Sequence, residues 1–589
     1  MKINFYRVLS VCMFLSFICD IFAVPAKPGV MQYEMPDGRK INVRLVGDEF
    51  CHQYLTEDGY PLIEEKGYLY YGDIDKSGKE INSGILAGNV DSRSTDAWNF
   101  VNKVNLEEFS DRFMTKATNS PRCRNHVIPL NAQKLNSNRV SESAGPTYEQ
   151  GYGLYPGASF PAYGSPRVLV ILVEYQDTKF RNFYDPYEYF YNMLNSEDFT
   201  DYKATGSALQ YFKDNSNGVF TPQFDLYGPL TLDHDYLYYG ENDRYGDDIR
   251  AHEMIIEACR QLDDVIDFND YDCDGDGIVD NVYVFYAGRG EASGGTSGTV
   301  WPHSWELSSA GIDDLILDGV RVERYACSNE LDGSYPDGIG TFVHEFGHVL
   351  GLPDIYQTGG YVTCFTPGDW CIMDQGSYNN DSRTPPNYGA FERYALGWIK
   401  PIEYDAPMSV TLPAIDRNEC GIIRTEKDTE FFLFENRQKE GWDKYVPGHG
   451  MLVWHISYNS LLWEQNQVNN TPSFQCVDIV EADNILDGPT RSGDSFPGTA
   501  NITSFTPETI PALVSWGGEN LNYPITEIAE KDGLITFNVL GGSASVNEII
   551  DMEDKGIIYY DLHGREVKNP SSGIYIKRQG QKIEKIILK

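Results

Sequence analysis

One stretch of this sequence decides the fold around it: His344-Glu-Phe-Gly-His-Val-Leu-Gly-Leu-Pro-Asp354. Its two histidines are four residues apart, which on a helix places them about 40° apart around the axis and about 6 Å apart along it, so both imidazoles can reach one metal ion. The pattern predicts a helix with one buried face, because apolar residues recur at intervals of four, three and four: Ile339, Val343, Phe346 and Leu350.

The residues between and after the histidines complete a hydrolytic site. Glu345 lies beside both histidines and is placed to act on a metal-bound water rather than to bind the metal. Gly351 can adopt the left-handed conformation that ends a helix, and Pro353 prevents the helix from resuming. We therefore expect the turned chain to bring Asp354 back to the metal as a third ligand.

Strand and helix patterns surround this stretch. Val168–Val173 is a continuous apolar run, as expected for a strand buried on both faces. Residues 251–262 have helical spacing, and 282–286 predict another buried strand. Strand, helix, strand and helix together predict an α/β layer.

A second motif, Asp272-Cys-Asp-Gly-Asp-Gly-Ile-Val-Asp280, predicts a calcium loop. Carboxylates stand at positions 1, 3, 5 and 9, with a glycine at position 6 for the sharp turn. The expected ligands are Asp272, Asp274, Asp276, Asp280 and the backbone of Ile278. Position 12 is Tyr283 rather than a glutamate, so the loop is not an EF-hand, and a solvated acidic turn is the alternative.

The spacing H-E-x-x-H-x-x-G-x-x-D resembles that of zinc metallopeptidases of the metzincin type. Most of those have histidine as the third ligand, whereas this chain has Asp354, an oxygen ligand that also suits Zn²⁺. The resemblance implies a methionine turn under the metal, which Trp370–Tyr378 fits with Met373 as the floor residue. It also makes Tyr378 a candidate donor to the transition state.

More closely, the chain resembles the immune inhibitor A family of secreted bacterial metallopeptidases. The matching segments are His344–Asp354, the loop at 272–280, Glu435-Asn-Arg-Gln438 and Gly450-Met-Leu-Val-Trp-His455. Asp37-Gly38 and Leu45-Val-Gly-Asp-Glu-Phe50 are similar to the propeptide of that family. The resemblance implies an α+β multidomain protein in which a zincin catalytic domain, a mixed sheet with the active-site helix, lies between a β-rich propeptide and C-terminal β domains. It implies a secreted zinc endopeptidase acting on extracellular proteins and made as a zymogen.

Composition agrees with an exported protein. The chain has 589 residues and a net charge of −40, which disfavours binding to nucleic acid or anionic lipid. Residues 1–23 resemble a signal peptide. No later segment has the run of about 18 apolar residues that a membrane span requires. We therefore expect a secreted or cell-surface protein.

Composition shifts suggest domain boundaries. We expect a propeptide and linker at 27–150, the zincin domain at 151–400, a β-rich domain at 401–540 and a β tail at 545–589. The tail, with Tyr559-Tyr-Asp-Leu-His-Gly-Arg-Glu-Val567, resembles C-terminal sorting tails of Gram-negative outer-surface secretion systems. Secretion machinery is accordingly an expected partner beside the peptide substrate.

Several residues keep alternative roles. Cys123, flanked by Arg122 and Arg124, resembles a cysteine switch that would hold the zymogen inactive, with Cys51 or an acidic propeptide side chain as alternatives. His303 is a second candidate oxyanion donor. The strand at 320–324 could pair with a peptide substrate or be an ordinary strand of the sheet. Less specific candidates are a calcium site at Asp483 and Asp494, a metal ligand at Glu392, and a disulfide between Cys364 and Cys371.

The rival function is a catalytically inactive surface adhesin built on a protease scaffold. The presence of Glu345 argues against it, because a binding scaffold needs no general base.

Overall fold

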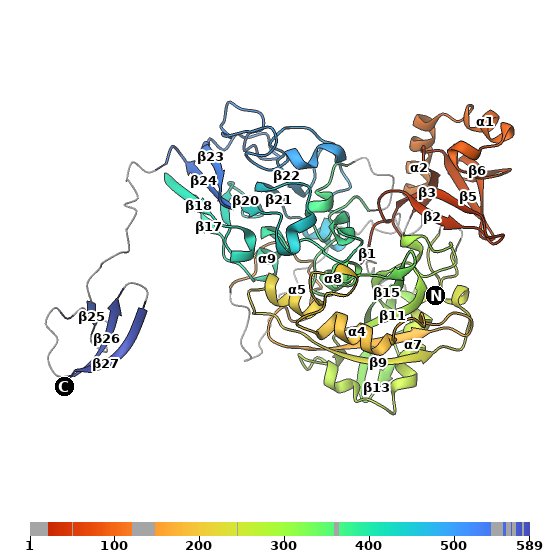
Figure 1. Ribbon diagram of the computed structural model, residues 1–589, viewed down its shortest axis with the longest axis horizontal. Coiled ribbons are helices and arrows are strands. Elements are labelled where there is room, and N and C mark those ends of the chain that lie inside the picture. The colour runs from red at the N-terminus through yellow and green to blue at the C-terminus, as the bar shows by residue number, and fades with distance from the viewer. Residues whose placement is uncertain are drawn as a thin grey trace, which may run out of the picture.

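The computed structural model of the protein describes residues 22–49, 51–119, 148–243, 246–358, 364–542, 558–560, 567, 573–579 and 582–588. The architecture is mixed α and β, with several separate sheets and short helices, which agrees in outline with the expected fold class (Figure 1). No helix within the described ranges is long and apolar enough to cross a membrane.

A central sheet with strand order β1-β12-β15-β11-β8-β9 carries the candidate site, and β16 pairs with β15. Strands β9, β8, β11 and β15 are parallel, whereas β12 and β1 are antiparallel additions at one edge. The bounds are β1 Phe22–Ala23, β8 Arg167–Glu174, β9 Gln223–Thr231, β11 Val282–Arg289, β12 His303–Glu306, β15 Arg324–Asp332 and β16 Tyr335–Pro336.

Strand β8 explains how this sheet is covered, because its side chains alternate between two cores. The even-numbered apolar residues pack in one core with helices α4 (Pro186–Asn195), α5 (Ala208–Asn215) and α8 (Ile339–Val349). The odd-numbered ones pack in the other core with α7 (Ala251–Leu262). The prediction of a strand buried on both faces is confirmed.

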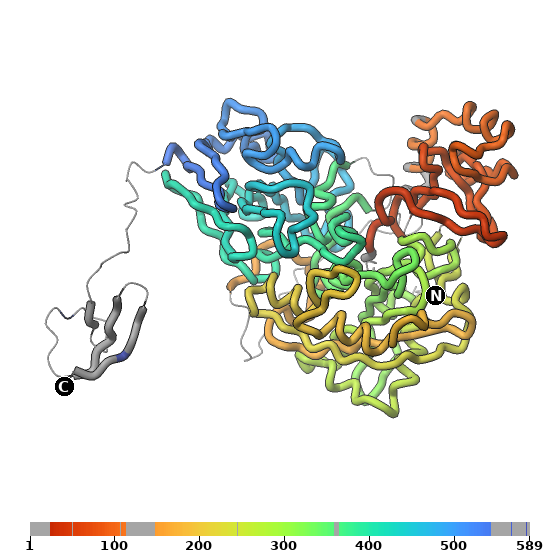
Figure 2. Tube along the Cα trace, in the orientation of Figure 1, coloured from red at the N-terminus to blue at the C-terminus, as the bar shows by residue number. Residues whose placement is uncertain are grey.

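The chain before this region forms a six-stranded antiparallel sheet, drawn in red and orange beside the central region (Figure 2). Its strands are β2 Met31–Glu34, β3 Lys40–Gly47, β4 His52–Thr56, β5 Pro61–Glu65, β6 Tyr68–Ile74 and β7 Glu80–Leu86, followed by α1 Thr95–Val101 and α2 Leu106–Asn119. It docks on the central region through a hydrogen bond from the Tyr54 hydroxyl to the Gly295 carbonyl, 2.8 Å, and an ion pair between His52 and Glu291, 2.9 Å.

The chain after the central region forms two further sheets. The first is β17-β19-β20-β21-β22 and the second is β18-β24-β23. Their bounds are β17 Ile402–Glu403, β18 Met408–Leu412, β19 Gly421–Arg424, β20 Glu430–Arg437, β21 Gly450–Ser457, β22 Val477–Ile479, β23 Ile525–Lys531 and β24 Leu534–Val539, with helices α9 Ala390–Leu396 and α10 Ser460–Glu464 nearby. Strands β20 and β21 contain the apolar runs at 431–434 and 451–456.

Three smaller elements complete the description. Near the Asp-rich loop, β10 (Ile278–Val279), β14 (Val320–Val322) and β13 (Ile316–Leu317) form their own sheet. Helix α6 covers Tyr236–Tyr239. The last described strands, β25 Ile558–Tyr560, β26 Gly573–Gln579 and β27 Lys582–Leu588, pair antiparallel.

The strand expected at 320–324 is confirmed as β14. Of its two possible roles the structure supports the ordinary sheet strand, because β14 pairs with β10 on one side and β13 on the other and leaves no edge for a peptide. The central sheet ends at the N-terminal strand β1, and β12 is paired with β1 on one side and with β15 on the other. Without β1, strand β12 would be the edge to which a peptide could add.

Candidate metal centre and peptide cleft

Helix α8 carries the centre and is packed closely against the chain that follows it. A Cβ on Gly340 would lie 1.9 Å from the Ser377 carbonyl oxygen, and a Cβ on Gly347 would lie 2.5 Å from the Met373 sulfur. Both glycines are therefore required by close approach rather than by flexibility. The helix ends as predicted, with Gly351 at φ +99°.

Three ligand atoms converge after this turn. The Nε2 atoms of His344 and His348 lie 3.2 Å apart, and each lies 3.2 Å from Oδ1 of Asp354. All three side chains are at most 2% exposed. Three ligands around one tetrahedral zinc at ~2.0–2.2 Å stand about 3.3 Å apart, so the geometry fits Zn²⁺.

The hydrogen bonds behind the imidazoles orient them for this role. Nδ1 of His344 lies 2.7 Å from the Ile372 carbonyl, and Nδ1 of His348 lies 2.8 Å from the Leu352 carbonyl. A carbonyl only accepts, so Nδ1 carries the proton and Nε2 of each neutral ring presents a lone pair. Oδ1 of Asp354 accepts no hydrogen bond from the described residues, which leaves this buried oxygen available to a cation.

Asn466 orients the third ligand, and sequence reasoning missed it. Its side-chain amide donates to Oδ2 of Asp354 at 2.6 Å, while its Oδ1 accepts from the Asp354 backbone N–H at 2.9 Å. Asn466 lies 112 positions further along the chain, just after α10. No local pattern could indicate it, because only the fold brings the two segments together.

Glu345 is completely buried beside the three ligands. Burial raises the pKa of its carboxyl well above the ordinary value, the charge of Asp354 raises it further, and one hydrogen bond opposes both. That bond comes from the backbone N–H of Val24, 3.0 Å from Oε1. Oε2 accepts no hydrogen bond from the described residues.

The chain's own N-terminal segment therefore lies in the cleft. Strand β1 pairs antiparallel with β12, Phe22 opposite Ser304 and Ala23 opposite His303. The indole N–H of Trp301 donates to the Val24 carbonyl at 2.9 Å. The hydroxyl of Tyr378 donates to the Pro25 carbonyl at 2.7 Å.

The two candidate oxyanion donors, Tyr378 and His303, differ in the groups that their polar atoms contact. Tyr378 directs its hydroxyl at a peptide carbonyl within the cleft, and burial raises the pKa of this phenol well above its usual value. His303 engages both ring nitrogens in the fold, Nδ1 with the Trp301 carbonyl at 2.7 Å and Nε2 with the Tyr325 hydroxyl at 2.9 Å. The expectation for His303 as an oxyanion donor is not supported by this arrangement.

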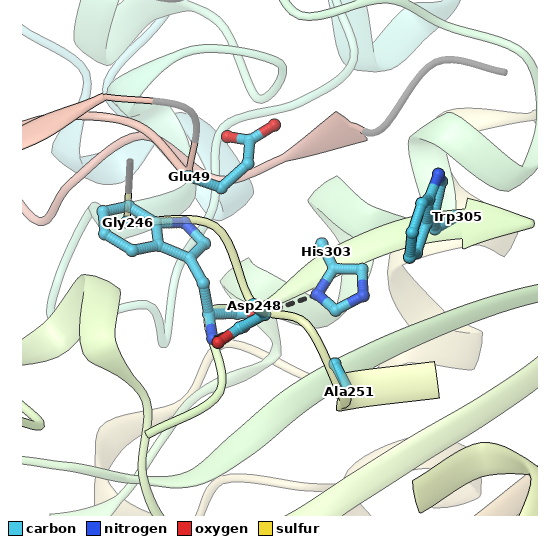
Figure 3. A pocket seen from close by; sticks show the side chains of 7 residues that line it. Glu49, Gly246, Asp248, Ala251, His303 and Trp305 are labelled. Carbon is cyan, nitrogen blue, oxygen red and sulfur yellow. Dashed lines mark hydrogen bonds between the residues drawn. The ribbon is translucent and has the colours of Figure 1, made fainter. Parts of the chain in front are cut away.

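A cavity beside β12 is lined by His303 and Glu49 (Figure 3). Its other lining residues are Gly246, Asp248, Ala251, Trp301 and Trp305. Glu49 comes from the turn after β3 and is 6% exposed. Burial raises the pKa of its carboxyl well above the usual value, and Asp48, Asp354 and Glu345 raise it further, so this turn lies near the metal centre.

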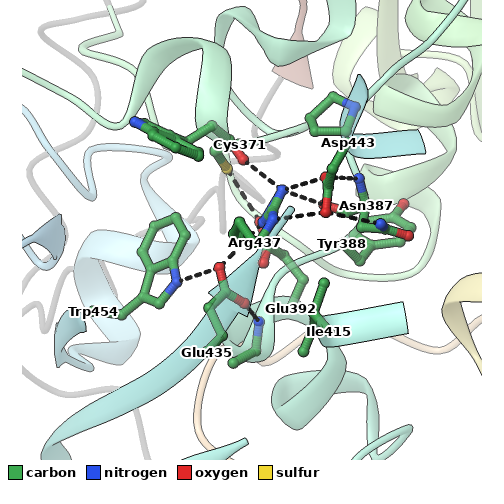
Figure 4. Close-up of polar contacts among 12 residues, drawn as sticks. Cys371, Asn387, Tyr388, Glu392, Ile415, Glu435, Arg437, Asp443 and Trp454 are labelled. Carbon is green, nitrogen blue, oxygen red and sulfur yellow. Dashed lines mark hydrogen bonds and ion pairs between the residues drawn. The ribbon is translucent and has the colours of Figure 1, made fainter. Parts of the chain in front are cut away.

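Met373 lies under the helix, in a turn that the C-terminal sheets hold in place. Arg437 of β20 is fully buried between Glu435, at 3.1 Å, and Asp443, at 2.9 Å, and donates to the Trp370 carbonyl at 3.1 Å (Figure 4). The Glu435-Asn-Arg-Gln438 segment is thus attached to the turn by a charged hydrogen bond.

Glu392 and Cys371 belong to the same network and not to the metal centre. The Cys371 thiol donates to Oε1 of Glu392 at 3.1 Å (Figure 4). Glu392 is therefore a packing-helix residue, and the alternative of Glu392 as a metal ligand is not supported. No disulfide joins Cys364 and Cys371 in the described part of the chain, so the candidate disulfide between them is not formed.

The Asp-rich loop forms a second group of acids. One oxygen each of Asp272, Asp274 and Asp276 lies within 4.8 Å of the others. Asp280 does not belong to this group, and its Oδ2 accepts from the Cys273 N–H at 2.9 Å. Among the described residues, no such group contains Asp483 or Asp494. Cys123, the proposed latency switch, lies outside the described residues.

Two imidazoles and a carboxylate around one point, with a buried glutamate beside a peptide nitrogen, are the combination of groups that metallopeptidase centres use. Comparison with known proteins agrees with this class. Residues 164–400 match the family model described as "Immune inhibitor A peptidase M6, catalytic domain". These residues are therefore similar to the catalytic domain of that family, which confirms the resemblance seen in the sequence.

Two relatives show how low the sequence identity to known proteins of this kind is. Immune inhibitor A of Bacillus thuringiensis subsp. alesti is 26% identical over 288 residues, which cover 41% of each chain. The pre-pro-metalloprotease PrtV of Vibrio cholerae serotype O1 is 26% identical over 257 residues, 36% of this chain and 27% of PrtV. The matched region thus spans well under half the length of either relative.

Proposed function

We propose that the chain is a secreted, zinc-dependent endopeptidase that is made as a zymogen and hydrolyses peptide bonds of extracellular proteins. The observation that carries this proposal is the mutual 3.2 Å separation of three buried ligand atoms next to Glu345. The M6 family match of residues 164–400 supports the same reaction class.

In this proposal His344, His348 and Asp354 hold the zinc ion. When bound, zinc supplies Lewis acidity to water and to the scissile carbonyl. Glu345 takes one proton from the attacking water and returns it to the nitrogen that leaves when the C–N bond breaks. The 3.0 Å contact between Glu345 Oε1 and the Val24 N–H supports this role, because it places the carboxylate within reach of a peptide nitrogen.

Two residues of the following turn assist. Tyr378 would donate a hydrogen bond to a substrate carbonyl, as its hydroxyl does to Pro25. Met373 would support the helix from below, where only a glycine at 347 leaves room for its sulfur.

Latency would follow from the N-terminal segment. Residues 22–25 lie between Glu345 and β12, where a substrate strand would have to pair, and Val24 and Pro25 would stay in the chain after removal of a signal peptide at 1–23. A substrate cannot enter until this segment leaves. The Cys123 hypothesis remains a separate proposal about the linker.

Calcium would be a second, structural ion. Asp272, Asp274 and Asp276 offer the clustered oxygens, and the Ile278 carbonyl and Asp280 are the remaining ligands proposed from the motif. Such an ion would stiffen the loop that leads into β11.

The wider organisation is proposed from the sequence. A signal peptide at 1–23 would direct export, residues 27–150 would be the propeptide and linker, and 151–400 the catalytic region. Residues 401–540 would form the β-rich domain, and the tail at 545–589 would engage outer-surface secretion machinery. The inactive adhesin is not favoured, because its scaffold needs no buried glutamate at a metal centre.

The test uses Glu345→Ala in the activated full-length chain. Casein hydrolysis should fall at least a hundredfold, the lower range for a lost general base, while bound zinc, measured by atomic absorption, stays at one per chain. Glu197→Ala, whose side chain is 75% exposed, is the matched control and should retain full activity. If Glu345→Ala kept a tenth of the turnover, or a zinc chelator left casein hydrolysis intact, the proposal would be overturned.

A further inference from the structure

The N-terminal segment lies in the cleft as a peptide substrate would, and it reveals how the far end of that cleft recognises side chains. This inference rests on the proposed peptidase function. Its basis is the antiparallel pairing of β1 with the edge strand β12, the mode by which an extended peptide adds to a sheet. Downstream of β1, Val24 and Pro25 are held by Trp301 and Tyr378 through their carbonyls.

The contact with Glu345 fixes the register of this segment. A general base that returns a proton to the leaving amine must contact the nitrogen of the scissile bond. That nitrogen is the backbone N of Val24, 3.0 Å from Oε1. The bond between Ala23 and Val24 thus occupies the reacting position, and residues 24 to 27 represent the first to fourth residues of the leaving half.

The fourth of these residues, Lys27, places its ammonium group against two acids. Its Nζ forms an ion pair with Oδ2 of Asp332 and lies 3.9 Å from Oδ1 of Asp381. The Lys27 and Asp332 side chains are 20% and 11% exposed, so this pair is partly shielded from water. The Lys27 backbone N–H donates to the Ala292 carbonyl at 2.9 Å, which keeps the residue at the wall of the central region.

The acidic wall does not depend on the N-terminal segment for its shape. Asp332 ends β15 and pairs through its backbone with Tyr335 of β16. Asp381 lies in a run of three left-handed residues, 380 to 382, with φ between +53° and +61°. The Gly340 N–H at the start of α8 donates to the Ser382 carbonyl at 2.7 Å, which fixes this strained loop beside the catalytic helix.

Other charges near the two acids do not cancel them. Arg383 lies 3.6 Å from Oδ2 of Asp381 and also donates to the Asp381 and Pro336 carbonyls. Asp337, which is buried next to α8, adds another acid: burial and the charge of Asp332 raise its pKa to about 6, whereas Lys27 lowers it. After the N-terminal segment has left, three acids (Asp332, Asp337 and Asp381) therefore stand against one cation, Arg383.

We propose that Asp332 and Asp381 form an acidic subsite that binds a lysine or arginine side chain at the fourth residue after the cleaved bond. The peptidase then prefers substrates with a basic residue at that position, and Lys27 is the intramolecular occupant of the subsite before activation.

The test measures peptide binding and cleavage with the activated full-length chain. Four peptides of one sequence differ only in the fourth residue after the cut, which is lysine, arginine, alanine or glutamate, and mass spectrometry locates the cut. We expect kcat/KM to be about tenfold higher for lysine than for glutamate, which corresponds to ~1.4 kcal/mol. The preference should weaken with added salt, because the carboxylates are partly exposed.

The variant Asp332→Asn with Asp381→Asn should reduce this ratio to about one. Asp416→Asn is the matched control, since the Asp416 side chain is 62% exposed and belongs to another part of the chain. Melting temperatures verify that each variant is folded. Equal rates for all four peptides in the wild type, or an unchanged preference in the double variant, would overturn the subsite.

Binding separates this inference from the proposed function. Fluorescence anisotropy with the Glu345→Ala protein measures the affinity for the same four peptides without any cleavage. Tighter binding of the lysine peptide supports the subsite even if no peptide is hydrolysed by the wild type, an outcome that would overturn the peptidase. Equal affinities for lysine and glutamate peptides overturn the subsite whether or not the wild type cleaves them.

Discussion

The two groups of metal-type ligands in this protein are built in opposite ways. His344, His348 and Asp354 are completely or almost completely buried. His344 and Asp354 are held by remote parts of the chain, and His348 is held by Leu352 in the turn after the helix. The acids of the 272–276 loop are exposed or partly exposed, and their oxygens accept from backbone N–H groups of the same loop. The first group depends on the whole fold, whereas the second depends on nine consecutive residues.

This difference determines how each group should respond to change. In the loop, the Asp276 N–H donates to Asp272 at 3.0 Å and the Ile278 N–H donates to Asp276 at 2.8 Å, so the turn is shaped by its own residues. In the metal centre, the Ile372 carbonyl and Asn466 come from two other segments. We therefore expect remote substitutions to weaken the centre and to leave the loop unaffected.

The largest expected effect is that of Asn466→Gly on zinc affinity. The substitution removes both hydrogen bonds to Asp354, and glycine accepts the φ of +46° at this position without strain. Loss of an outer partner of a metal ligand typically costs 10–100-fold in affinity, up to ~2.7 kcal/mol. Competition with a zinc chelator of known affinity measures it.

The control for that experiment is Asn470→Gly. Asn470 lies in the same segment but contacts Thr358 rather than a ligand, with its Oδ1 2.9 Å from the Thr358 N–H. Zinc affinity should not change in this variant. Equal affinities of Asn466→Gly and wild type would show that Asp354 is oriented without Asn466, and the contrast between the two groups would be lost.

The same contrast explains what sequence could predict about the site. His344, Glu345, His348 and Asp354 lie within eleven residues, so spacing alone places them on one helix and the turn after it. Asn466 and the backbone contacts of Ile372 depend on long-range packing that no local pattern encodes. Sequence reasoning also missed the N-terminal segment in the cleft, because residues 24–27 have no feature that distinguishes them from a leader.

The fold was predictable where strands are long and apolar. Strands β8 and β11 and helices α7 and α8 bury continuous or periodic apolar runs, and the patterns indicate them correctly. Strand β12 has only four residues, His303-Ser-Trp-Glu306, with little alternation to detect. The more apolar segment at 320–322 was therefore considered as a substrate-pairing strand or an ordinary sheet strand, and it is the second, in a separate small sheet.

The next effect concerns the loop. If Asp272, Asp274 and Asp276 bind calcium in the folded state only, a thirtyfold excess of calcium over Kd stabilises the protein by about 2 kcal/mol. Asp274→Ala with Asp276→Ala should abolish most of the calcium-induced rise in melting temperature measured by calorimetry. Asp313→Ala with Asp314→Ala removes two exposed acids outside the loop and should keep the rise. Equal rises in both double variants would mean that the loop is a solvated acidic turn.

A third acidic region sharpens the comparison, because its carboxylates are buried without forming a ligand group. Asp494 is 2% exposed, and its Oδ2 accepts from the Trp370 indole N–H at 3.1 Å. Its Oδ1 accepts no hydrogen bond from the described residues. Burial raises the pKa of Asp494 to about 7, and the charge of Asp483 contributes in the same direction, against the Trp370 hydrogen bond.

The smallest expected effect is that of Asp494→Asn on the pH dependence of stability. Between the unfolded pKa of ~3.9 and the folded pKa of about 7, native Asp494 keeps a proton that the unfolded chain has lost, so the free energy of unfolding falls as pH rises through this window. Asparagine carries no charge at any pH in this window. The variant should match the wild type near pH 4 and be more stable at pH 8 by about 1–2 kcal/mol, as measured by urea denaturation at both pH values.

The control is Asp416→Asn, whose side chain is 62% exposed and which should show no such gain. A calcium-dependent stabilisation at pH 8 that Asp494→Asn removes would instead place a cation here, and the buried acids would then resemble the metal centre rather than contrast with it.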